Sequence, residues 1–366
     1  MLNKEMNSFD RVMSSLSFKE PDRVPLFLLL STYGAKEMKV SVKEYFSKWE
    51  NIVDMQIKMK KKYNNDLVFT FFYAALEIEA MGGEVIFFPD GPPNSGEPIL
   101  KSSKDIEEFE IPNIKNNIHL SKVLKATKAL KSKLGDEVPI IGVVLSPFSL
   151  PVMQMGFEKY LDLIYFNPNH FNLLMKKNEE FCVRWANAQI EAGATAICYF
   201  DPLASPNIIE PHTYLETGHK VAKRALKRIN GPTAIHLASG IALPVIDEII
   251  STGTQVLGFS SSDDLDHIKR ASKDRICLLG NLNGIEIVHW DKAKVEKEVK
   301  KLIKKAGRGG GLIISDNHGE IPLQVPERVL LEISEAVREY GKYPLNNDTK
   351  ELITVKINKR KVKNLN

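Results

Sequence analysis

The sequence predicts a parallel α/β barrel of the (β/α)8 type, the TIM barrel. Short runs rich in β-branched residues alternate with longer amphipathic runs along most of the chain, as in strands joined by crossover helices. The short runs number eight, the strand count that such a barrel requires. A doubly wound open sheet is the alternative, but no GxGxxG follows an early strand to support dinucleotide binding.

The elements can be placed in order along the chain. The expected strands are Val24–Leu30, Asp66–Phe71, Pro139–Leu145, Ala194–Phe200, Thr233–Leu237, Gln255–Phe259, Ile276–Gly280 and Leu312–Ser315. The clearest helices are Val42–Lys62, Pro168–Ala192, His212–Arg228, Ala242–Ser251, Lys292–Ala306 and Pro326–Tyr340, whose ends glycine or proline often marks. Residues 84–112, with the turn cluster PDGPPNSGEP, do not fit this repeat. We expect an inserted hairpin and loop over the barrel mouth there.

Length and composition agree with a single globular domain. The chain has 366 residues, which one barrel domain can reach, with 43% hydrophobic and 26% charged residues. We predict a barrel over residues 1–345 followed by a basic tail, residues 346–366. Residues 350–366 hold six Lys/Arg and one Glu, a net charge of +5, so the total of +4 leaves about −1 elsewhere. The body is therefore not expected to bind nucleic acid, and we interpret the tail as a solvated terminus rather than a contact for an anionic partner.

The cysteines and the apolar runs bear on the compartment. Cys182, Cys198 and Cys277 are far apart and form no CxxC, so neither a disulfide framework nor a zinc-finger module is indicated. No uncharged stretch approaches the roughly 18 to 20 residues that a spanning helix needs. We therefore expect a cytoplasmic protein without a membrane partner; the sequence does not predict the oligomeric state.

Polar residues gather where the expected strands end, which is where active sites of this fold lie. In chain order they are Asp201, His236, Ser260, Asp263, Asp264, Asn281, Asp316, Asn317, His318 and Glu320. Each also has a structural interpretation: a hydrogen-bonded histidine, a turn residue, or, for Asp263 and Asp264, a helix N-cap and first-turn acid, which we favour. Two histidines and several acids at one rim are nevertheless hard to explain as separate turn devices. They are suited either to hold zinc or to transfer protons.

The chain resembles the uroporphyrinogen decarboxylase superfamily, which contains porphyrinogen decarboxylases and corrinoid-linked methyltransferases on a (β/α)8 barrel. The likeness covers about residues 8–345. It rests on RVMSSLSFKEPDRVPLF at 11–27, SPFSL at 146–150, FDPLASPNIIEP at 200–211, IHLASG at 235–240, LLGNLNG at 278–284 and REYGKYPL at 338–345. The combination is specific to the superfamily, although each segment alone is weak.

The resemblance argues against uroporphyrinogen decarboxylation. The decarboxylases carry an arginine-rich RQAGR-type segment after the first strand, where this chain has Ser31-Thr-Tyr-Gly-Ala35. Their pyrrole-binding aspartate falls at Tyr73, counted back from Ala80-Met-Gly-Gly-Glu-Val85. An acidic tetrapyrrole would lose its ion pairs and its central hydrogen-bond acceptor.

The zinc methyltransferases of the superfamily imply a metal site at the barrel mouth. They use an H-x-C motif after strand 5 and a further cysteine after strand 8; here these positions are His236, Ala238 and His318. The thiolate pair is absent, so the resemblance leaves a histidine and carboxylate site for zinc: His236 and His318, completed by Asp201, Asp316 or Glu320.

The methyltransferase branch implies transfer of a methyl group from a small donor to the cob(I)alamin of a separate corrinoid protein. His236 and His318, with Asp201 and Tyr73, are the expected catalytic residues, and Asn281 and Ser260 are expected to contact the cofactor. Aromatic residues near the second strand, Phe69, Phe71, Phe72 and Tyr73, suit a methoxylated aromatic donor, although core packing explains them about as well. Two other classes stay open: a metal-free decarboxylase or lyase of a small acid, and a non-catalytic subunit that docks a corrinoid protein.

Overall fold

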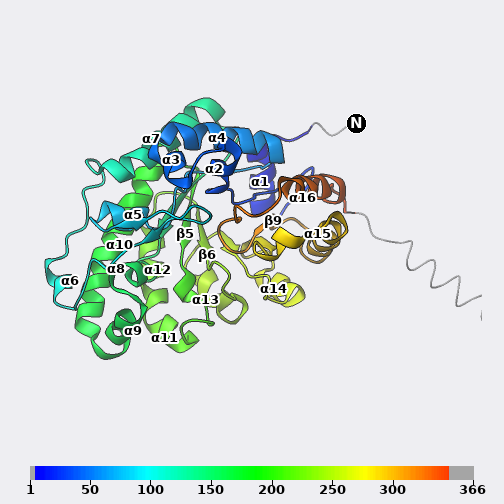
Figure 1. Cartoon of the computed structure of the whole chain (residues 1–366). Coiled ribbons are helices and arrows are strands. Elements are labelled where there is room, and N and C mark those ends of the chain that lie inside the picture. The colour runs from blue at the N-terminus through cyan, green and yellow to red at the C-terminus, as the bar shows by residue number, and fades with distance from the viewer. Residues whose placement is uncertain (1–4, 346–366) are drawn as a thin grey trace, which may run out of the picture.

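A curled sheet of seven parallel strands forms the centre of the protein (Figure 1). The computed structural model describes residues 5–345. The sheet order is β1-β4-β5-β6-β7-β8-β9, so each strand pairs with the next one along the chain. The strands are β1 (Val68–Phe69), β4 (Ile140–Leu145), β5 (Ala196–Phe200), β6 (Thr233–His236), β7 (Val256–Gly258), β8 (Cys277–Leu282) and β9 (Leu312–Asp316). Seven of the eight predicted strands are confirmed, and the fold is TIM-barrel-like.

The one predicted strand that is not confirmed, Val24–Leu30, joins the sheet only through scattered hydrogen bonds. Leu26 forms an isolated parallel bridge with Ile314 of β9, and its carbonyl accepts the Asp66 N–H at 2.8 Å. Elsewhere side chains replace ladder partners, because Asp66 Oδ2 accepts the Leu26 N–H at 2.8 Å and Asn65 Oδ1 accepts the Leu28 N–H at 3.0 Å. Pro25 also lacks an N–H to donate. These residues lie between β9 and β1 without forming a regular strand.

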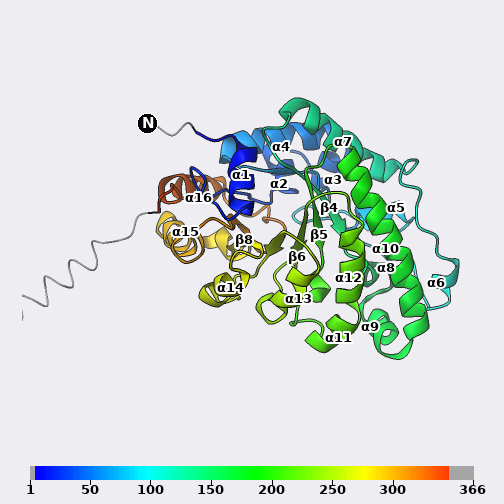
Figure 2. The same cartoon turned by 180° about the vertical axis from the view of Figure 1, so that it is seen from behind.

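Helices surround the sheet on its outer side (Figures 1 and 2). They are α1 (Ser8–Leu16), α2 (Tyr33–Met38), α3 (Val42–Ser47), α4 (Trp49–Tyr63), α5 (Leu76–Ala80), α6 (Asp105–Glu108), α7 (Ile118–Leu134), α8 (Pro151–Met155), α9 (Phe157–Phe166), α10 (Pro168–Glu191), α11 (Pro211–Glu216), α12 (Gly218–Lys227), α13 (Ile246–Ser251), α14 (Leu265–Ser272), α15 (Lys292–Ala306) and α16 (Glu327–Tyr340), with short 3-10 turns at Pro202–Ala204, Leu243–Val245 and Glu286–His289. Two predicted helices are broken, and of a third, predicted over Ala242–Ser251, only Ile246–Ser251 is α-helical, after the 3-10 turn Leu243–Val245. The first divides into α3 and α4 at Lys48, and another divides into α11 and α12 at Thr217, where the backbone is not helical.

The insertion after α5 contains the expected hairpin. Strands β2 (Val85–Ile86) and β3 (Asn94–Ser95) pair antiparallel, with Ile86 opposite Asn94. The loop between them is bonded to the segment before α16, since Gln324 Nε2 donates to the Asp90 carbonyl at 2.7 Å. The hairpin therefore lies beside the loop that follows β9.

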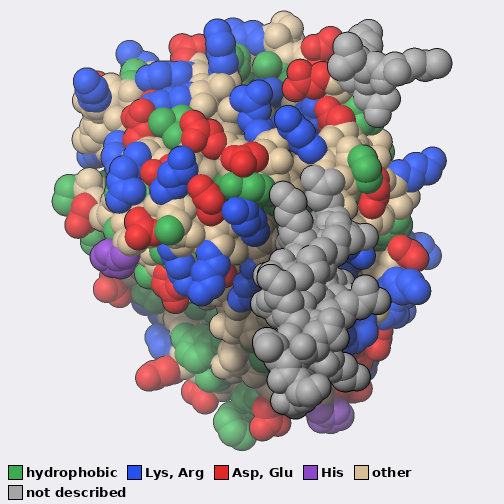
Figure 3. Space-filling view, turned by 90° about the vertical axis from the view of Figure 1, so that its right-hand side faces the viewer, with side chains coloured by type: hydrophobic (Ala, Val, Ile, Leu, Met, Phe, Trp, Pro, Cys, Tyr) green, Lys and Arg blue, Asp and Glu red, His purple; other side chains and the backbone are tan. Residues whose placement is uncertain are grey.

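Surface charge, cysteines and the chain ends complete the description of the fold. Lys, Arg, Asp and Glu are interspersed over the face in Figure 3, without one sign dominating. No helix among residues 5–345 is long and apolar enough to cross a membrane. Cys182, Cys198 and Cys277 are free thiols, as expected. The basic tail lies outside the described residues and stays a prediction.

Candidate active site

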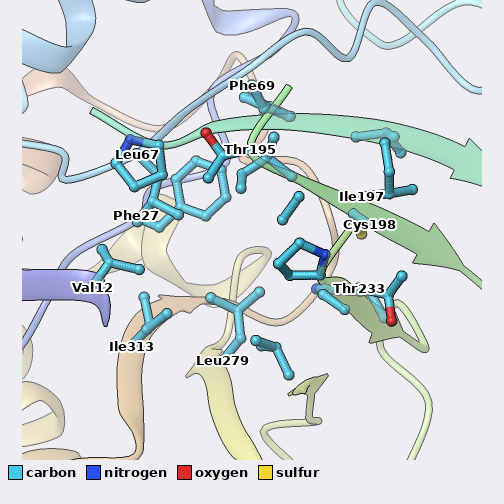
Figure 4. Close-up of a pocket in the computed structure, with 18 of the residues that line it drawn as sticks. Val12, Phe27, Leu67, Phe69, Thr195, Ile197, Cys198, Thr233, Leu279 and Ile313 are labelled. Atoms are coloured by element: carbon cyan, nitrogen blue, oxygen red, sulfur yellow. The ribbon is translucent and has the colours of Figure 1, made fainter. Parts of the chain in front are cut away.

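Two cavities meet at the carboxyl ends of the strands. The mouth cavity, of about 460 Å³, lies between the β2–β3 loop and the loop after β9, and its lining includes Phe88, His318 and Glu320. The barrel cavity, of about 110 Å³, lies inside the curled sheet (Figure 4). His236 forms part of its wall. Phe71, Phe200 and Gly319 line both cavities, so the two are adjacent and share part of their walls. The structure thus places the two predicted histidines on adjacent cavities, His236 on the barrel cavity and His318 on the mouth cavity.

His236 ends β6 and is 1% exposed. Its Nδ1 accepts the Ala238 N–H at 3.0 Å, which assigns the ring proton to Nε2. Nε2 is buried without a partner. Burial, with His318 nearby, lowers the pKa of His236 to about 4, so the ring is neutral at physiological pH. His236 therefore presents an unused N–H donor.

The ring of His318 has the same hydrogen-bonding pattern as that of His236, with Nδ1 as the acceptor. Its Nδ1 accepts the Gly284 N–H at 3.2 Å, and in the amide orientation that satisfies both of its ends, Asn317 also donates to Nδ1 at 2.7 Å. The proton is thereby assigned to Nε2 here too. Partial burial lowers the pKa of His318. The two imidazoles are thus neutral rings whose Nε2–H groups are free of the backbone bonds that hold Nδ1.

Two acidic side chains, Asp316 at the end of β9 and Glu320 in the loop that follows, differ in their contacts. Asp316 is fully buried, and its carboxylate accepts the His318 N–H at 3.2 Å and the Leu29 N–H at 3.3 Å, so it holds this loop against the segment 24–30. Burial raises the pKa of Asp316 to about 7. Glu320 accepts the Thr32 N–H at 2.7 Å and lines the mouth cavity. Burial, and Asp316 nearby, raise the pKa of Glu320 to about 8, which keeps a proton on this carboxyl group at neutral pH.

Two glycines allow the strand ends to approach closely. A Cβ on Gly258 would lie 2.4 Å from Cδ2 of His236, and a Cβ on Gly319 would lie 3.0 Å from the Phe200 ring and 3.9 Å from Cε1 of His236. Gly319 also has φ of +88°, a conformation that side chains disfavour. The loop after β9 can therefore descend onto the ends of β5 and β6.

The residues present do not fit the predicted zinc site. A histidine that binds metal through Nε2 normally donates from Nδ1, whereas Nδ1 of His236 and of His318 each accept a backbone N–H. Among residues 5–345 no group of three or more His, Cys, Asp or Glu side chains is placed to hold a metal ion. We derive no chemistry through zinc, and the zinc site stays a prediction that metal analysis tests.

Asp201 is not brought together with the histidines. Its Oδ1 accepts the hydroxyls of Ser146 and Ser149, each at 2.6 Å, while Oδ2 has no partner. Burial raises the pKa of Asp201 to about 6, against the lowering by the two serines. It follows Tyr199 and Phe200 at the end of β5; Phe200 lines the cavities, and Asp201 lines neither. Its observed contacts are those of a residue that joins the loops after β4 and β5.

Three other predicted residues also lie off the cavities. The Tyr73 hydroxyl donates to Glu79 at 2.7 Å, and burial raises the pKa of Tyr73. Ser260 donates to the Ser239 carbonyl at 2.8 Å, and Asn281 Nδ2 donates to the Ser260 carbonyl at 2.8 Å. The contacts of Ser260 and Asn281 tie the loops after β6 and β7 to β8. Tyr73, Ser260 and Asn281 line neither the mouth cavity nor the barrel cavity.

The favoured interpretation of Asp263 and Asp264, that they serve the N-terminus of the following helix, is confirmed for Asp264 only. Asp264 caps α14 by accepting the His267 N–H at 2.8 Å. Asp263 instead accepts the N–H groups of Ala242, Leu243 and Ser260. It bridges the loops after β6 and β7.

Sequence reasoning missed Thr32, Phe200 and Phe88 as cavity residues. Phe200 lies on the same face of β5 as Cys198 and Ala196, which also line the barrel cavity, so strand periodicity was a usable signal. Phe88 lies in the insertion that was expected over the mouth. Thr32 contacts Glu320 across 288 positions of sequence, which no local pattern indicates.

The fold and the site define a class: α/β proteins that carry their polar groups at the carboxyl-end mouth of a curled parallel sheet. The chain belongs to the uroporphyrinogen decarboxylase family, whose sequence model matches residues 7–340.

Among curated relatives, uroporphyrinogen decarboxylase of Pseudoalteromonas atlantica is 25% identical over 358 residues, covering 92% of this chain and 98% of its own. That of Aeromonas salmonicida is 25% identical over 338 residues, covering 86% and 92%. Among solved structures, a methyltransferase from Methanosarcina mazei superposes with a TM-score of 0.81 at 20% identity, covering 92% of this chain and 99% of that one. A putative vitamin-B12 independent methionine synthase from Listeria monocytogenes has a TM-score of 0.52 at 15% identity, covering 88% and 98%. At these identities the two structures show a shared fold.

Proposed function

We propose that this protein is a methyltransferase that moves a methyl group from a small donor to the cob(I)alamin of a separate corrinoid protein. The observation that carries the proposal is the common hydrogen-bonding polarity of His236 and His318, which leaves two Nε2–H donors on two adjacent cavities that share wall residues. A cobalt(I) corrinoid, when its carrier protein is docked, would supply the nucleophile that accepts the methyl group. The family and the fold shared with a methyltransferase agree with this activity.

The residues of this chain would act on the leaving atom. As the carbon–oxygen or carbon–nitrogen bond of the donor breaks, negative charge develops on the departing atom, and a neutral imidazole N–H can stabilise it by a hydrogen bond. Glu320, which keeps its proton at neutral pH, would then transfer that proton to the departing atom. Phe71, Phe200 and Phe88 would exclude water from the reacting groups.

The lining of the mouth cavity disfavours an acidic tetrapyrrole as substrate. None of its described residues is Lys or Arg, and Asp90 and Glu320 are both present. A substrate with many carboxylates needs cationic partners when it is taken out of water. The curated relatives are named for such a substrate, but the segment Ser31–Ala35 carries no arginine, and its Thr32 N–H instead binds Glu320.

The test is formation of methylcobalamin from cob(I)alamin, followed by absorbance, with methanol, trimethylamine and anisole as donors. We expect turnover with at least one donor, and His318→Ala should lower the rate by about 10²- to 10⁴-fold. Circular dichroism should show that the variant is folded. A variant with full turnover would contradict the role of His318.

Two further measurements separate the alternatives. Release of carbon dioxide from a small acid without cobalamin would favour the lyase, and tight binding of a corrinoid protein without turnover would favour the docking subunit. Metal analysis beside the double variant His236→Ala, His318→Ala tests the zinc prediction: about one zinc per chain, lost in the variant, would establish the site.

A further inference from the structure

The interior of the curled sheet is hollow. Along β4, β5, β6 and β7 the fully buried residues alternate with partly exposed ones, and the partly exposed ones all line the barrel cavity: Ile141, Val143, Ala196, Cys198, Phe200, Ala234 and Val256. The outward-facing residues pack against the helices. In most barrels of this type, layers of side chains fill the interior. Here the inner face is less tightly packed than the outer one.

Nearly all of the wall is apolar. Figure 4 shows Phe27, Phe69, Leu279 and Ile313 around the cavity, with Val12 of α1 at one end. These side chains come from β1, β8 and β9, from the segment 24–30 and from the N-terminal helix. An apolar cavity of this kind stays dry, and one of about 150 Å³ in another protein binds benzene. The space of about 110 Å³ is therefore suited to a small ring or alkyl group.

The polar groups of the wall are already bonded, with one exception. Thr195 Oγ1 accepts the Ile140 N–H at 3.0 Å, and Gln255 accepts the Thr233 N–H at 2.8 Å while donating to Gly253. Among the described lining residues, His236 alone has a buried side-chain nitrogen or oxygen without a partner, its Nε2. Among residues 5–345, no Asp, Glu, Lys or Arg lines the wall, so an ionised ligand would find no countercharge there.

We propose that the barrel cavity binds the uncharged apolar part of a small ligand, held by one hydrogen bond from His236 Nε2 to an acceptor atom at its upper end. The proposed route of entry is from the adjacent mouth cavity, past Phe71, Phe200 and Gly319, which line both spaces. An ether or a similar neutral molecule has the required chemistry: an apolar body and one acceptor without charge. That this ligand is the methyl donor rests on the proposed function; the binding itself does not.

Calorimetric titration of the full chain with toluene, anisole and benzoate, without any corrinoid, tests the proposal. Toluene and anisole should bind saturably, with anisole about three- to tenfold tighter because its oxygen can accept from His236. Benzoate should not bind detectably. Absence of saturable binding by both neutral probes, or tighter binding of benzoate, would overturn the proposal.

Two variants locate the binding. Ala234→Leu places a larger side chain in the cavity and should weaken both neutral probes at least about tenfold, whereas Ala293→Leu, exposed on α15, should leave them unchanged. His236→Leu should remove the preference for anisole over toluene. Melting temperatures would confirm that each variant is folded. Unaltered binding to Ala234→Leu would place the ligand elsewhere and refute the proposal.

The titration also separates this proposal from the proposed function. Neutral probes that bind without any methyl transfer to cob(I)alamin would support the cavity and contradict the methyltransferase. Methyl transfer without probe binding would support the methyltransferase and contradict the cavity.

Discussion

At the scale of single residues, the polarity of a hydrogen bond decides what a histidine can do. His236 and His318 both use Nδ1 to accept a backbone N–H, and this leaves Nε2 as a donor. The sequence indicated the two histidines but left zinc binding and proton transfer equally open. In a histidine that binds metal through Nε2, Nδ1 normally carries a proton and donates it to a neighbouring acceptor. Here a backbone N–H donates to Nδ1 of each ring, so the proton lies on Nε2, and the local structure favours hydrogen-bond donation by Nε2 over metal binding.

The hydrogen-bond partners of Asp201 likewise indicate its role, which we expect to be structural. Asp201→Asn keeps an oxygen to accept from Ser146 and Ser149, so turnover should stay within about threefold of wild type and the free energy of unfolding within about 1 kcal/mol. Asp201→Ala should lower that free energy by about 1 to 3 kcal/mol, because it leaves the two buried hydroxyls without their acceptor. Urea unfolding beside the methylcobalamin assay measures both. If the Asp201→Asn variant is folded but has no turnover, Asp201 takes part in catalysis and the structural role is wrong.

Glu77 yields a pH dependence of stability. It is 4% exposed, accepts the Leu145 N–H at 2.9 Å, and burial raises its pKa to about 8 from 4.5. The folded state therefore holds this proton more tightly than the unfolded state, and the stability associated with it is lost as pH rises from about 4.5 to 8.

Glu77→Gln removes the titration while keeping an acceptor for Leu145. Relative to wild type, its free energy of unfolding should increase by on the order of 3 kcal/mol between pH 5 and pH 8. Urea unfolding at the two pH values measures this, with Glu158→Gln, exposed on α9, as the matched control. An equal difference at both pH values would show that Glu77 does not titrate in this window.

At the scale of elements, the β2–β3 hairpin forms one wall of the mouth cavity. Its Phe88 is 43% exposed and lines that cavity, and its loop is bonded to Gln324. The insertion was visible in the sequence as a break in the strand–helix repeat. Its contact with the loop after β9 was not, because these residues lie 234 positions apart.

We expect Phe88→Ser to raise the KM for the methyl donor by about three- to tenfold with little change in kcat, since it removes apolar area from the wall without touching the histidines. Phe166→Ser, on α9, removes an aromatic ring that is 81% exposed and lines neither cavity, and it should leave both constants unchanged. Steady-state kinetics compares the two. A fall in kcat alone for Phe88→Ser would show that the hairpin acts in the reaction step instead.

At the scale of the whole molecule, a buried ion network holds the segment 24–30 beside the sheet. Asp66 binds Arg11 of α1 and Arg23, each at 2.7 Å, and also accepts the Leu26 N–H. Asp66 is 1% exposed at its side chain. The network therefore connects the N-terminal helix, the irregular edge segment and the start of β1.

Asp66→Asn should lower the free energy of unfolding by about 3 to 5 kcal/mol, because it leaves two largely buried guanidinium groups with less countercharge. Asp54→Asn removes an ion pair with Lys133 whose aspartate is 61% exposed, and it should cost less than about 1 kcal/mol. Urea unfolding measures both variants. Equal losses would mean that the Asp66 network does not hold the molecule together.

The sequence by itself determined the family, seven of the strands, most helices, the inserted hairpin and the strand ends at which His236 and His318 lie. These features depend on local periodicity and on short motifs, which neighbouring residues carry. Only the tertiary structure decided which strand-end residues share a cavity. Asp201 and Phe200 are adjacent in sequence, yet Phe200 lines both cavities whereas the Asp201 side chain, just beyond the end of β5, binds Ser146 and Ser149. The hollow interior is likewise a property of eight segments packed together, and no single segment specifies it.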